Sequence, residues 1–367
     1  MKKSLVYIAD FSLPNMSAYA LHVLKMCDAF SEFRYSVKLI LPYKKNTYNY
    51  SKIKKDFLLK KKFEIISIFY KKKFLFFLTR IFFTYKIFFY LRKENINKVY
   101  SRSIVPAVIL SFFKYDVILE IHTEMSGFTK FFFKVINLKF LRDNLKIVVI
   151  NKKLIDLLSI NNKNCLILDD AVDPRDFKKT KKNRTFKNTC FYSGSFVEGK
   201  GIETIQKLAH ALPQFDFHLY GNIRTYNNYV TEKFPKNMVF KGFISYNKLT
   251  KKIKNYKILL MPYQKKIGVL IKNTKVEKYF SPLKMFDYMA SGKIIIASDL
   301  KVYKHILKNK INSILIDPDK ISLWIKSIKN VSKSKNLNYL GYNAMKDALN
   351  HSWILRVKKI QKFYEKK

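Results

Sequence analysis

Two lysines of this sequence lie where an expected helix begins, a position that suits an acidic residue better. In the segment YFSPLKMFDYMASGK (279–293), Ser281 is the expected N-cap, Pro282 the first helical residue, and Gly292 the left-handed residue that closes the helix. Lys284 then falls in the first turn, where free N–H groups and the positive end of the helix dipole favour a carboxylate. Lys284 is therefore either a solvated surface lysine or part of a site that binds an anion together with the helix amides.

A glycine-rich turn supplies the second lysine. The segment YSGSFVEGKGIETI (192–205) follows an expected strand, and Gly194, Gly199 and Gly201 allow a tight backbone next to a ligand. Lys200 lies where the next helix begins, again beside exposed N–H groups. From Gly194 onward the chain matches the first seven positions of a P-loop, but Gly201 stands where magnesium binding requires Ser or Thr, which argues against a nucleoside triphosphatase. An ordinary glycine turn that caps a helix is the simpler alternative.

The elements that must position these turns alternate along the chain. Short β-branched or aromatic runs are separated by segments of helical length, which is the pattern of βαβ units and a mostly parallel sheet. A polar, basic stretch from 178 to 187 interrupts the alternation and is the expected linker. The expected strands are residues 4–10, 36–42, 63–68, 98–103, 116–122, 145–151 and 165–173 before it, and 189–195, 215–221, 238–243, 257–263, 293–299 and 313–318 after it.

This alternation predicts an α/β fold with two doubly wound domains, over residues 1–177 and 178–350, and a C-terminal helix over 351–367 that can return to the first domain. A chain of 367 residues is long enough for two domains with separate cores. Ligands of such sheets bind at the carboxyl ends of strands. Because Lys200 and Lys284 follow two strands of the second domain, both turns are expected at its ligand crevice, and a diphosphate is a ligand that they could share.

Composition excludes several classes of protein. With 48% hydrophobic and 16% aromatic residues, and nine each of Gly and Pro, the chain is folded rather than of low complexity. The three cysteines, Cys27, Cys165 and Cys190, lack metal-ligand spacing, and their odd number argues against a disulfide framework. We therefore expect a reducing compartment. The apolar run after the two N-terminal lysines ends at Asp10, which is too early for the core of a signal peptide.

Charge favours an anionic partner without identifying it. The net charge of +46 suits nucleic acid, but Lys, Asn, Ile, Phe and Tyr are abundant together, as codons rich in A and T would produce, and we find no nucleic-acid motif. Residues 52–93 hold 13 Lys or Arg and two acids, with twelve aromatic residues from Phe63 onward. Arg80 and Lys86 interrupt the apolar run 74–92, so a membrane span is disfavoured. A helix on an anionic membrane surface, or a buried crossover helix with solvated lysines, fits this segment.

Further segments occur in a specific order around the two lysine turns. They are SAYALHVLKMCDAF (17–30), YSRS (100–103), LEIH (119–122), DAVDPRDF (170–177) and HSWILRVKKI (351–360). Together with the SPLK and glycine-rich turns they resemble the GT-B glycosyltransferases of family 4, the glycosyl transferases group 1. The resemblance covers nearly the whole chain and implies a retaining enzyme with two Rossmann-like domains that face each other across a cleft.

The glycine-rich turn matches the family with one departure. In that family a Gly-Arg-Leu segment, followed five residues after its arginine by Lys-Gly, holds the donor diphosphate. Gly194, Ser195 and Phe196 occupy the first three positions, and Lys200 with Gly201 the last two. Ser195 thus stands in place of the arginine.

The helix segment also matches the family with one departure. The family has paired acids eight positions apart, and Asp287 matches the second, which the resemblance implies binds the donor ribose. Tyr279 replaces the first acid. The turn SPLK resembles a subgroup in which Ser-Pro-Leu-Lys faces the phosphate, and this accounts for Lys284.

Within this frame, Lys200, Lys284 and the amides around Ser281 to Leu283, a donor-binding turn that includes Pro282, stabilise the departing β-phosphate, so neither a divalent metal nor a cofactor is expected. The resemblance implies that His122 reaches the sugar and β-phosphate. The alternative for His122 is a satisfied histidine at a strand end.

Further contacts are expected from the first domain. Arg102 contacts the donor or the acceptor, or pairs with an acid such as Glu120. Asn15, Met16 and Ser17 lie in the first turn, where family members approach the donor phosphate, although here the turn lacks the usual glycines.

We therefore expect a cytoplasmic glycosyltransferase of the hexosyltransferase class, peripheral on the inner face of the plasma membrane. It is expected to transfer a sugar with retention from a nucleotide-diphosphate donor to a saccharide or lipid-linked acceptor in surface polysaccharide biosynthesis. No nucleic-acid partner is expected. Because Ser195 and Tyr279 depart from the family, two alternatives stay open. One is a catalytically lost GT-B protein that binds anionic membrane or nucleic acid, and the other is a GT-B sugar-nucleotide epimerase.

Overall fold

The protein consists of two compact α/β units. The structure is a computed structural model that describes residues 3–42, 49–68, 76–125, 127, 130–131, 133, 145–160, 164–177, 185–222, 234–265 and 280–365. Unit 1 comprises Met1–Asp169 and Trp353–Lys367, and unit 2 comprises Asp170–Ser352. The first boundary is expected from the sequence after residue 177, but unit 2 already begins at Asp170, because Val172 and Phe177 pack into its core. The second boundary, expected after residue 350, lies after Ser352.

Unit 1 contains a seven-stranded sheet in which all pairs are parallel. Its strands are β1 (Lys3–Ile8), β2 (Tyr35–Leu41), β3 (Glu64–Ser67), β4 (Lys98–Ser101), β5 (Asp116–Ile121), β6 (Leu145–Val149) and β7 (Cys165–Ile167). They lie in the order β3-β2-β1-β4-β5-β6-β7, so the direction of strand addition reverses between β1 and β4. Loops at the carboxyl ends of the strands beside such a reversal form the ligand crevice of a doubly wound fold.

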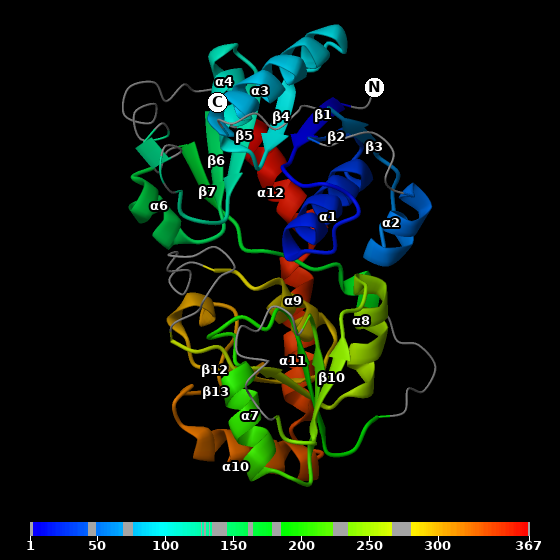
Figure 1. Cartoon of the computed structure of the whole chain (residues 1–367), viewed down its shortest axis with the longest axis vertical. Helices are drawn as coiled ribbons and strands as arrows, with labels where there is room; N and C mark the ends of the chain where they lie inside the picture. The colour runs from blue at the N-terminus through cyan, green and yellow to red at the C-terminus, as the bar shows by residue number, and fades with distance from the viewer. Residues whose placement is uncertain are drawn as a thin grey trace. The chain divides into compact units, whose positions relative to one another are not determined.

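Helices cover the sheet of unit 1. They are α1 (Ala18–Glu32), α2 (Tyr50–Phe57), α3 (Phe76–Lys93), α4 (Ile104–Phe112), α6 (Lys152–Leu158) and α12 (Trp353–Glu365). Helices α1, α2 and α6 are capped by Ser17, Asn49 and Asn151, whose side chains accept hydrogen bonds from backbone N–H groups of the first turn. The C-terminal helix α12 packs against α1, so the two ends of the chain meet in this unit (Figure 1).

Unit 2 repeats the arrangement with six parallel strands in the order β10-β9-β8-β11-β12-β13. The strands are β8 (Thr189–Ser193), β9 (Asp216–Tyr220), β10 (Met238–Gly242), β11 (Ile258–Met261), β12 (Ile294–Ser298) and β13 (Ile314–Ile316). The helices are α7 (Ile202–Ala211), α8 (Tyr246–Lys252), α9 (Leu283–Ala290), α10 (Ile321–Lys333) and α11 (Asn338–Ala348), with short 3-10 turns η2 (Pro174–Phe177), η4 (Ile253–Asn255), η6 (Lys301–Tyr303) and η7 (Leu349–His351).

Side chains of the unit 2 sheet alternate between two apolar layers, as the period of a strand requires. In β11, Ile258 and Leu260 join the layer that α7 and α10 cover. Leu259 and Met261 point the other way, into the layer that contains α9 and α11. Because both faces are covered, the strand reads as an uninterrupted apolar run, which is typical of parallel sheets.

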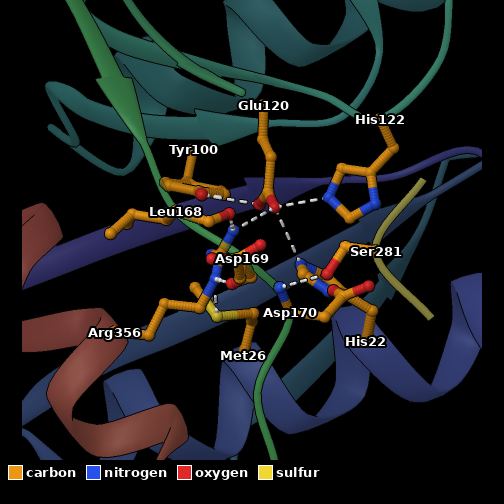
Figure 2. A network of polar contacts seen from close by, with 10 residues as sticks. All are labelled: His22, Met26, Tyr100, Glu120, His122, Leu168, Asp169, Asp170, Ser281 and Arg356. Carbon is orange, nitrogen blue, oxygen red and sulfur yellow. Dashed lines mark hydrogen bonds and ion pairs between the residues drawn. The ribbon is translucent and has the colours of Figure 1, made fainter. Parts of the chain in front are cut away.

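The strand predictions are confirmed, since each of the thirteen expected segments overlaps an observed strand. The predicted start of α9 is wrong by one residue, because the helix begins at Leu283 and Pro282 is its N-cap. The hydroxyl of Ser281 accepts a hydrogen bond from the backbone N–H of Asp170 instead, at 3.0 Å (Figure 2). Gly292 adopts φ +68° after the last turn, as expected for a left-handed terminus.

Candidate active site

Lys284 lies in the first turn of α9 with its ammonium group buried. Its Nζ forms no hydrogen bond with any residue that the structure describes. The nitrogen lies 3.9 Å from the ring centroid of Tyr192 and 5.1 Å from that of Tyr263. Burial and the charge of Lys200 hold the pKa of Lys284 well below its usual value. An unpaired buried cation is costly, so this position favours a bound anion.

Gly194 provides the space that the Lys284 ammonium group occupies. A β-carbon at Gly194 would lie 2.6 Å from Lys284 Nζ and 3.0 Å from its Cε. The backbone of Gly194 also adopts φ +143°, which L-residues rarely adopt. A side chain at Gly194 would therefore displace the flexible end of Lys284, which belongs to the other turn.

Lys200 belongs to the same cluster. Its Nζ donates a hydrogen bond to Ser195 Oγ at 2.8 Å, and burial lowers the pKa of Lys200. The Tyr192 hydroxyl lies 3.3 Å from the carbonyl oxygen of Ser195 and 3.1 Å from that of Lys200, so its single O–H can donate to either end of the turn. Ser195, which replaces the arginine of the family pattern, therefore holds a lysine in place.

Both helices at this cluster begin without a side-chain cap. Gly201 is the N-cap of α7 and Pro282 the N-cap of α9, and neither accepts a first-turn N–H through a side chain. At Gly201 a β-carbon would lie 2.4 Å from the carbonyl oxygen of Pro262, so only glycine fits there. Two helix starts and two lysines thus give this part of unit 2 a positive potential that suits a diphosphate.

Asp287, expected to bind a ribose, lies on α9 one turn beyond the uncapped start. Its side chain is buried and its Oδ1 accepts a hydrogen bond from the Tyr246 hydroxyl at 2.9 Å. Tyr279, which replaces the first family acid, lies outside the described residues.

In unit 1 a buried carboxylate, Glu120, organises a polar network around His122 (Figure 2). Tyr100 donates its hydroxyl to Glu120 Oε2 at 2.6 Å, and Arg356 Nη2 donates to Oε1 at 2.7 Å. His122 Nε2 lies 2.6 Å from the same Oε1, and His22 Nε2 lies 3.0 Å from it. Burial alone would raise the pKa of Glu120, but Arg356 and the two histidines outweigh it and hold the pKa well below the usual value.

The ionised Glu120 decides which nitrogen of His122 carries the proton. A carboxylate can only accept, so His122 Nε2–H donates and Nδ1 keeps its lone pair. Burial, followed by the charge of Arg102, lowers the pKa of His122 from 6.5 to about 4. His122 is therefore a neutral imidazole near pH 7, with Nδ1 able to accept a hydrogen bond.

Arg356 of α12 also contacts the backbone of Leu168 and Asp169, where the first of the two chain segments of unit 1 ends. Its Nε donates to the carbonyl of Asp169 at 3.0 Å, and its Nη2 lies 3.4 Å from the carbonyl of Leu168. His22, Glu120 and His122 lie close enough together to ligate a metal ion. The permanently charged guanidinium on Glu120 Oε1 disfavours a cation there, so we assign these residues to a hydrogen-bond network.

Arg102 does not form the ion pair with Glu120 that the sequence left open, because Arg356 occupies that carboxylate. The Arg102 guanidinium instead lies over the Tyr19 ring, 4.4 Å from its centroid. In the first turn of unit 1, Asn15 Oδ1 accepts from the Ser17 N–H at 2.8 Å. Ser17 in turn caps α1 through Ala20 N at 3.2 Å, and Met16 between them is partly exposed.

His22 and Arg356 belong to the segments 17–30 and 351–360, and the sequence alone assigns neither residue a role. Glu120 and His122 are two residues apart on one strand, so their side chains share a face, and this spacing was the available signal. His22 and Arg356 come from helices at opposite ends of the chain. Their arrival at the same carboxylate could not be read from spacing.

The sequence and the fold were compared with known proteins. Residues 173–347 match the family model described as Glycosyl transferases group 1. A comparison with curated proteins finds no match. The fold is similar to a glycosyltransferase from Rickettsia africae ESF-5, with a TM-score of 0.76 and 13% identity over 99% of this chain and 98% of that one.

Two ligand-bound structures are also similar. Anabaena Alr3699/HepE in complex with UDP and glucose gives a TM-score of 0.72 at 11% identity, covering 98% of this chain and 99% of that one. A mutant of S. aureus TarM in complex with Fondaparinux, alpha-GlcNAc-glycerol and UDP gives 0.70 at 11% identity, covering 99% and 100%. These likenesses show that the chain has the GT-B fold, with two Rossmann-like units.

Proposed function

We propose that this chain, whose residues 173–347 match the glycosyl transferases group 1 model, transfers a sugar with retention from a nucleotide-diphosphate donor to a saccharide or lipid-linked acceptor in surface glycan synthesis. The donor diphosphate binds at the start of α9 and at the turn before α7. Lys284, Lys200 and the uncapped helix amides stabilise the negative charge of the leaving group without a divalent metal.

The buried ammonium group of Lys284, which has no hydrogen-bond partner among the residues that the structure describes, is the observation that carries this proposal. A folded protein rarely leaves a cation in such a position unless a ligand completes it. A diphosphate satisfies Lys284 and the amide of Leu283 at the start of α9, and Lys200 in the turn before α7. Asp287, one turn further along α9, then has the spacing to accept a hydrogen bond from the ribose.

The ligands of similar proteins support a nucleotide-sugar donor. The Anabaena structure holds UDP and glucose, and the S. aureus structure holds UDP with alpha-GlcNAc-glycerol. His122 of unit 1 is proposed to contact a sugar hydroxyl through Nδ1, since Glu120 engages its Nε2. The neutral imidazole can accept a hydrogen bond from a sugar hydroxyl at Nδ1, whereas an imidazolium could only donate to it.

We further propose that α3 rests on the cytoplasmic surface of an anionic membrane. Leu78, Phe82, Tyr85 and Phe89 are 51–58% exposed and recur every three or four residues, so they form one outer face. The opposite face is buried against unit 1, which makes α3 a crossover helix with an aromatic outer surface. No helix in the described part of the chain is long and apolar enough to cross a membrane.

Basic side chains accompany the aromatic face. Lys86 Nζ lies 5.0 Å from the Phe82 ring centroid, and the Arg92 guanidinium lies 5.5 Å from that of Phe88. An amphipathic helix with this chemistry binds at the level of lipid headgroups, through apolar insertion and attraction to anionic lipid.

Incubation with UDP-, GDP- and ADP-sugars, with and without EDTA, tests the proposed reaction. Release of a nucleoside diphosphate together with transfer of the sugar, undiminished by EDTA, supports it. Conversion of the nucleotide sugar into its epimer would indicate an epimerase. Nucleotide binding without turnover of any donor would indicate a protein that has kept the fold and lost catalysis.

A further inference from the structure

In unit 1 the cation Arg102 has no counter-ion among the residues that the structure describes. Its Nε and Nη1 atoms are buried and form no hydrogen bond with any residue of the described ranges. The guanidinium stacks on the Tyr19 ring, which holds its plane in one orientation. Because an arginine cannot release its proton inside a protein, it needs an acceptor when it leaves water.

Glu120 and Asp10, two carboxylates of unit 1, are already engaged by other residues. Glu120 accepts from Tyr100 and pairs with Arg356. Asp10, whose backbone N–H bonds to the Tyr19 hydroxyl, forms an ion pair with Arg80. Neither carboxylate forms a hydrogen bond with the Arg102 guanidinium in the structure, so a charge-balancing acceptor has to come from elsewhere.

The backbone places Arg102 at the carboxyl edge of the sheet of unit 1, beside the reversal of strand order. Its N–H donates to the carbonyl of Ile8 at 2.9 Å, immediately beyond the paired ends of β1 and β4. This is the point at which the strand order reverses. His122 follows the next strand, β5, and lies close enough for the charge of Arg102 to lower its pKa. The carboxyl edge at a reversal is the ligand crevice of this class of sheet.

We propose that Arg102 is an anion-binding residue of unit 1 and that its guanidinium takes an oxyanion, a phosphate or a carboxylate. Its unpartnered Nε–H and Nη1–H groups are charged donors, which suit the oxygens of such a group. The oxyanion belongs either to the acceptor or to the donor diphosphate, and titrations with phosphate and UDP separate these sources. The inference depends on unit 1 and does not require that the lysine cluster of unit 2 binds a nucleotide.

The test follows the Arg102 Nε–H resonance by NMR in the full-length protein labelled with 15N-arginine. The resonance is assigned by its loss in Arg102→Lys. Titration with inorganic phosphate should shift it along a saturable curve, while sodium chloride at the same ionic strength should not. Arg175, whose Nε already donates to Asp173 at 2.9 Å, is the internal control and should not move.

Variants extend the test to binding. In a Lys200→Ala, Lys284→Ala background, phosphate should still bind, Arg102→Lys should weaken it several-fold, and Arg102→Gln should abolish saturable binding. In the parent, one outcome is that UDP shifts the Arg102 resonance and phosphate then has no further effect. That result assigns the oxyanion to the donor. A response to phosphate that persists under saturating UDP assigns it to the acceptor.

An Arg102 resonance that responds to neither phosphate, acetate nor UDP would overturn the inference. Failure of the protein to bind UDP while Arg102 still responds to phosphate would instead count against the proposed function and leave the anion site of unit 1 standing.

Discussion

Gly194 and Lys284 pack so closely that a β-carbon on the glycine would lie 2.6 Å from the lysine Nζ. The two residues belong to different turns of unit 2, and the contact joins the glycine-rich segment to the start of α9. This packing fixes the ammonium group at the base of the proposed diphosphate site.

Gly194→Ala should therefore weaken UDP binding by about tenfold or more, equivalent to about 1.4 kcal/mol, because the new methyl group displaces the Lys284 ammonium group. Folding stability should also fall by about 1 kcal/mol, since φ is positive at this residue. Gly242→Ala is the matched control, because Gly242 also has a positive φ but a β-carbon there meets nothing within 4 Å. The control should lose stability and keep its UDP affinity, both measured by calorimetry. Equal losses of affinity in the two variants would contradict the proposed role of the contact.

UDP binding should take up protons. Burial and Lys200 depress the pKa of Lys284 in the free protein, and a bound diphosphate raises it again. Lys284 is thus less protonated when free than when bound, so affinity should fall as pH rises through its free pKa. Titration calorimetry in buffers of different ionisation enthalpy should show uptake of up to about one proton per UDP. Lys284→Met should remove this uptake, and a parent that releases protons would contradict the assignment.

His122 should make folding stability depend on pH. The unfolded chain protonates this histidine near pH 6.5, whereas the folded protein does so only near pH 4. The folded state therefore loses stability as pH falls from 6.5 to about 4, on the order of 3 kcal/mol in all. Urea unfolding of His122→Gln should show a flatter profile across this window. His210→Gln, an exposed change on α7, should follow the parent, and identical profiles for all three proteins would count against a neutral buried His122.

The outer face of α3 should control membrane binding. The parent should sediment with anionic liposomes at low salt, be released at high salt, and bind neutral vesicles much less. The double variant Phe82→Ser, Phe89→Ser should bind several-fold less because inserted aromatic surface is lost. Tyr342→Ser removes an exposed aromatic ring from α11 of unit 2 and should bind as the parent does. Sedimentation that is independent of both lipid charge and the α3 residues would refute a membrane surface on α3.

The elements of the fold could be predicted because their signals are local. Each strand is a short apolar run bounded by turn residues, and β11 is one example whose two faces are both covered. The start of α9 lies one residue later than the capping pattern predicts, because the Ser281 hydroxyl does not cap the helix. It accepts a hydrogen bond from the backbone N–H of Asp170, more than a hundred residues earlier. Local capping rules cannot anticipate such a tertiary partner.

Residues of the candidate site could be predicted where a single turn contains both the charged side chain and the helix start beside it. Lys200 and Lys284 were each identified from a helix start, but the contact through Gly194 depends on how two turns pack. The same limit applies to Glu120, since its partners His22 and Arg356 come from α1 and α12. Sequence spacing specifies which side chains share a strand or a turn, and only packing specifies which turns meet.

Calorimetric measurement of UDP binding to Lys284→Ala, beside Lys284→Met and Asp287→Ala, tests the central claim most directly. Loss of a charge-assisted hydrogen bond should cost Lys284→Ala about 1.5 to 3 kcal/mol of UDP affinity, and Lys284→Met, which keeps an apolar stem against Tyr192, a similar amount. Asp287→Ala should lose UDP affinity but keep its affinity for inorganic pyrophosphate, because the ribose contact alone is removed. If Lys284→Ala and Lys284→Met bind UDP, GDP and ADP as the parent does, the lysine does not face a diphosphate and the proposed donor site is wrong.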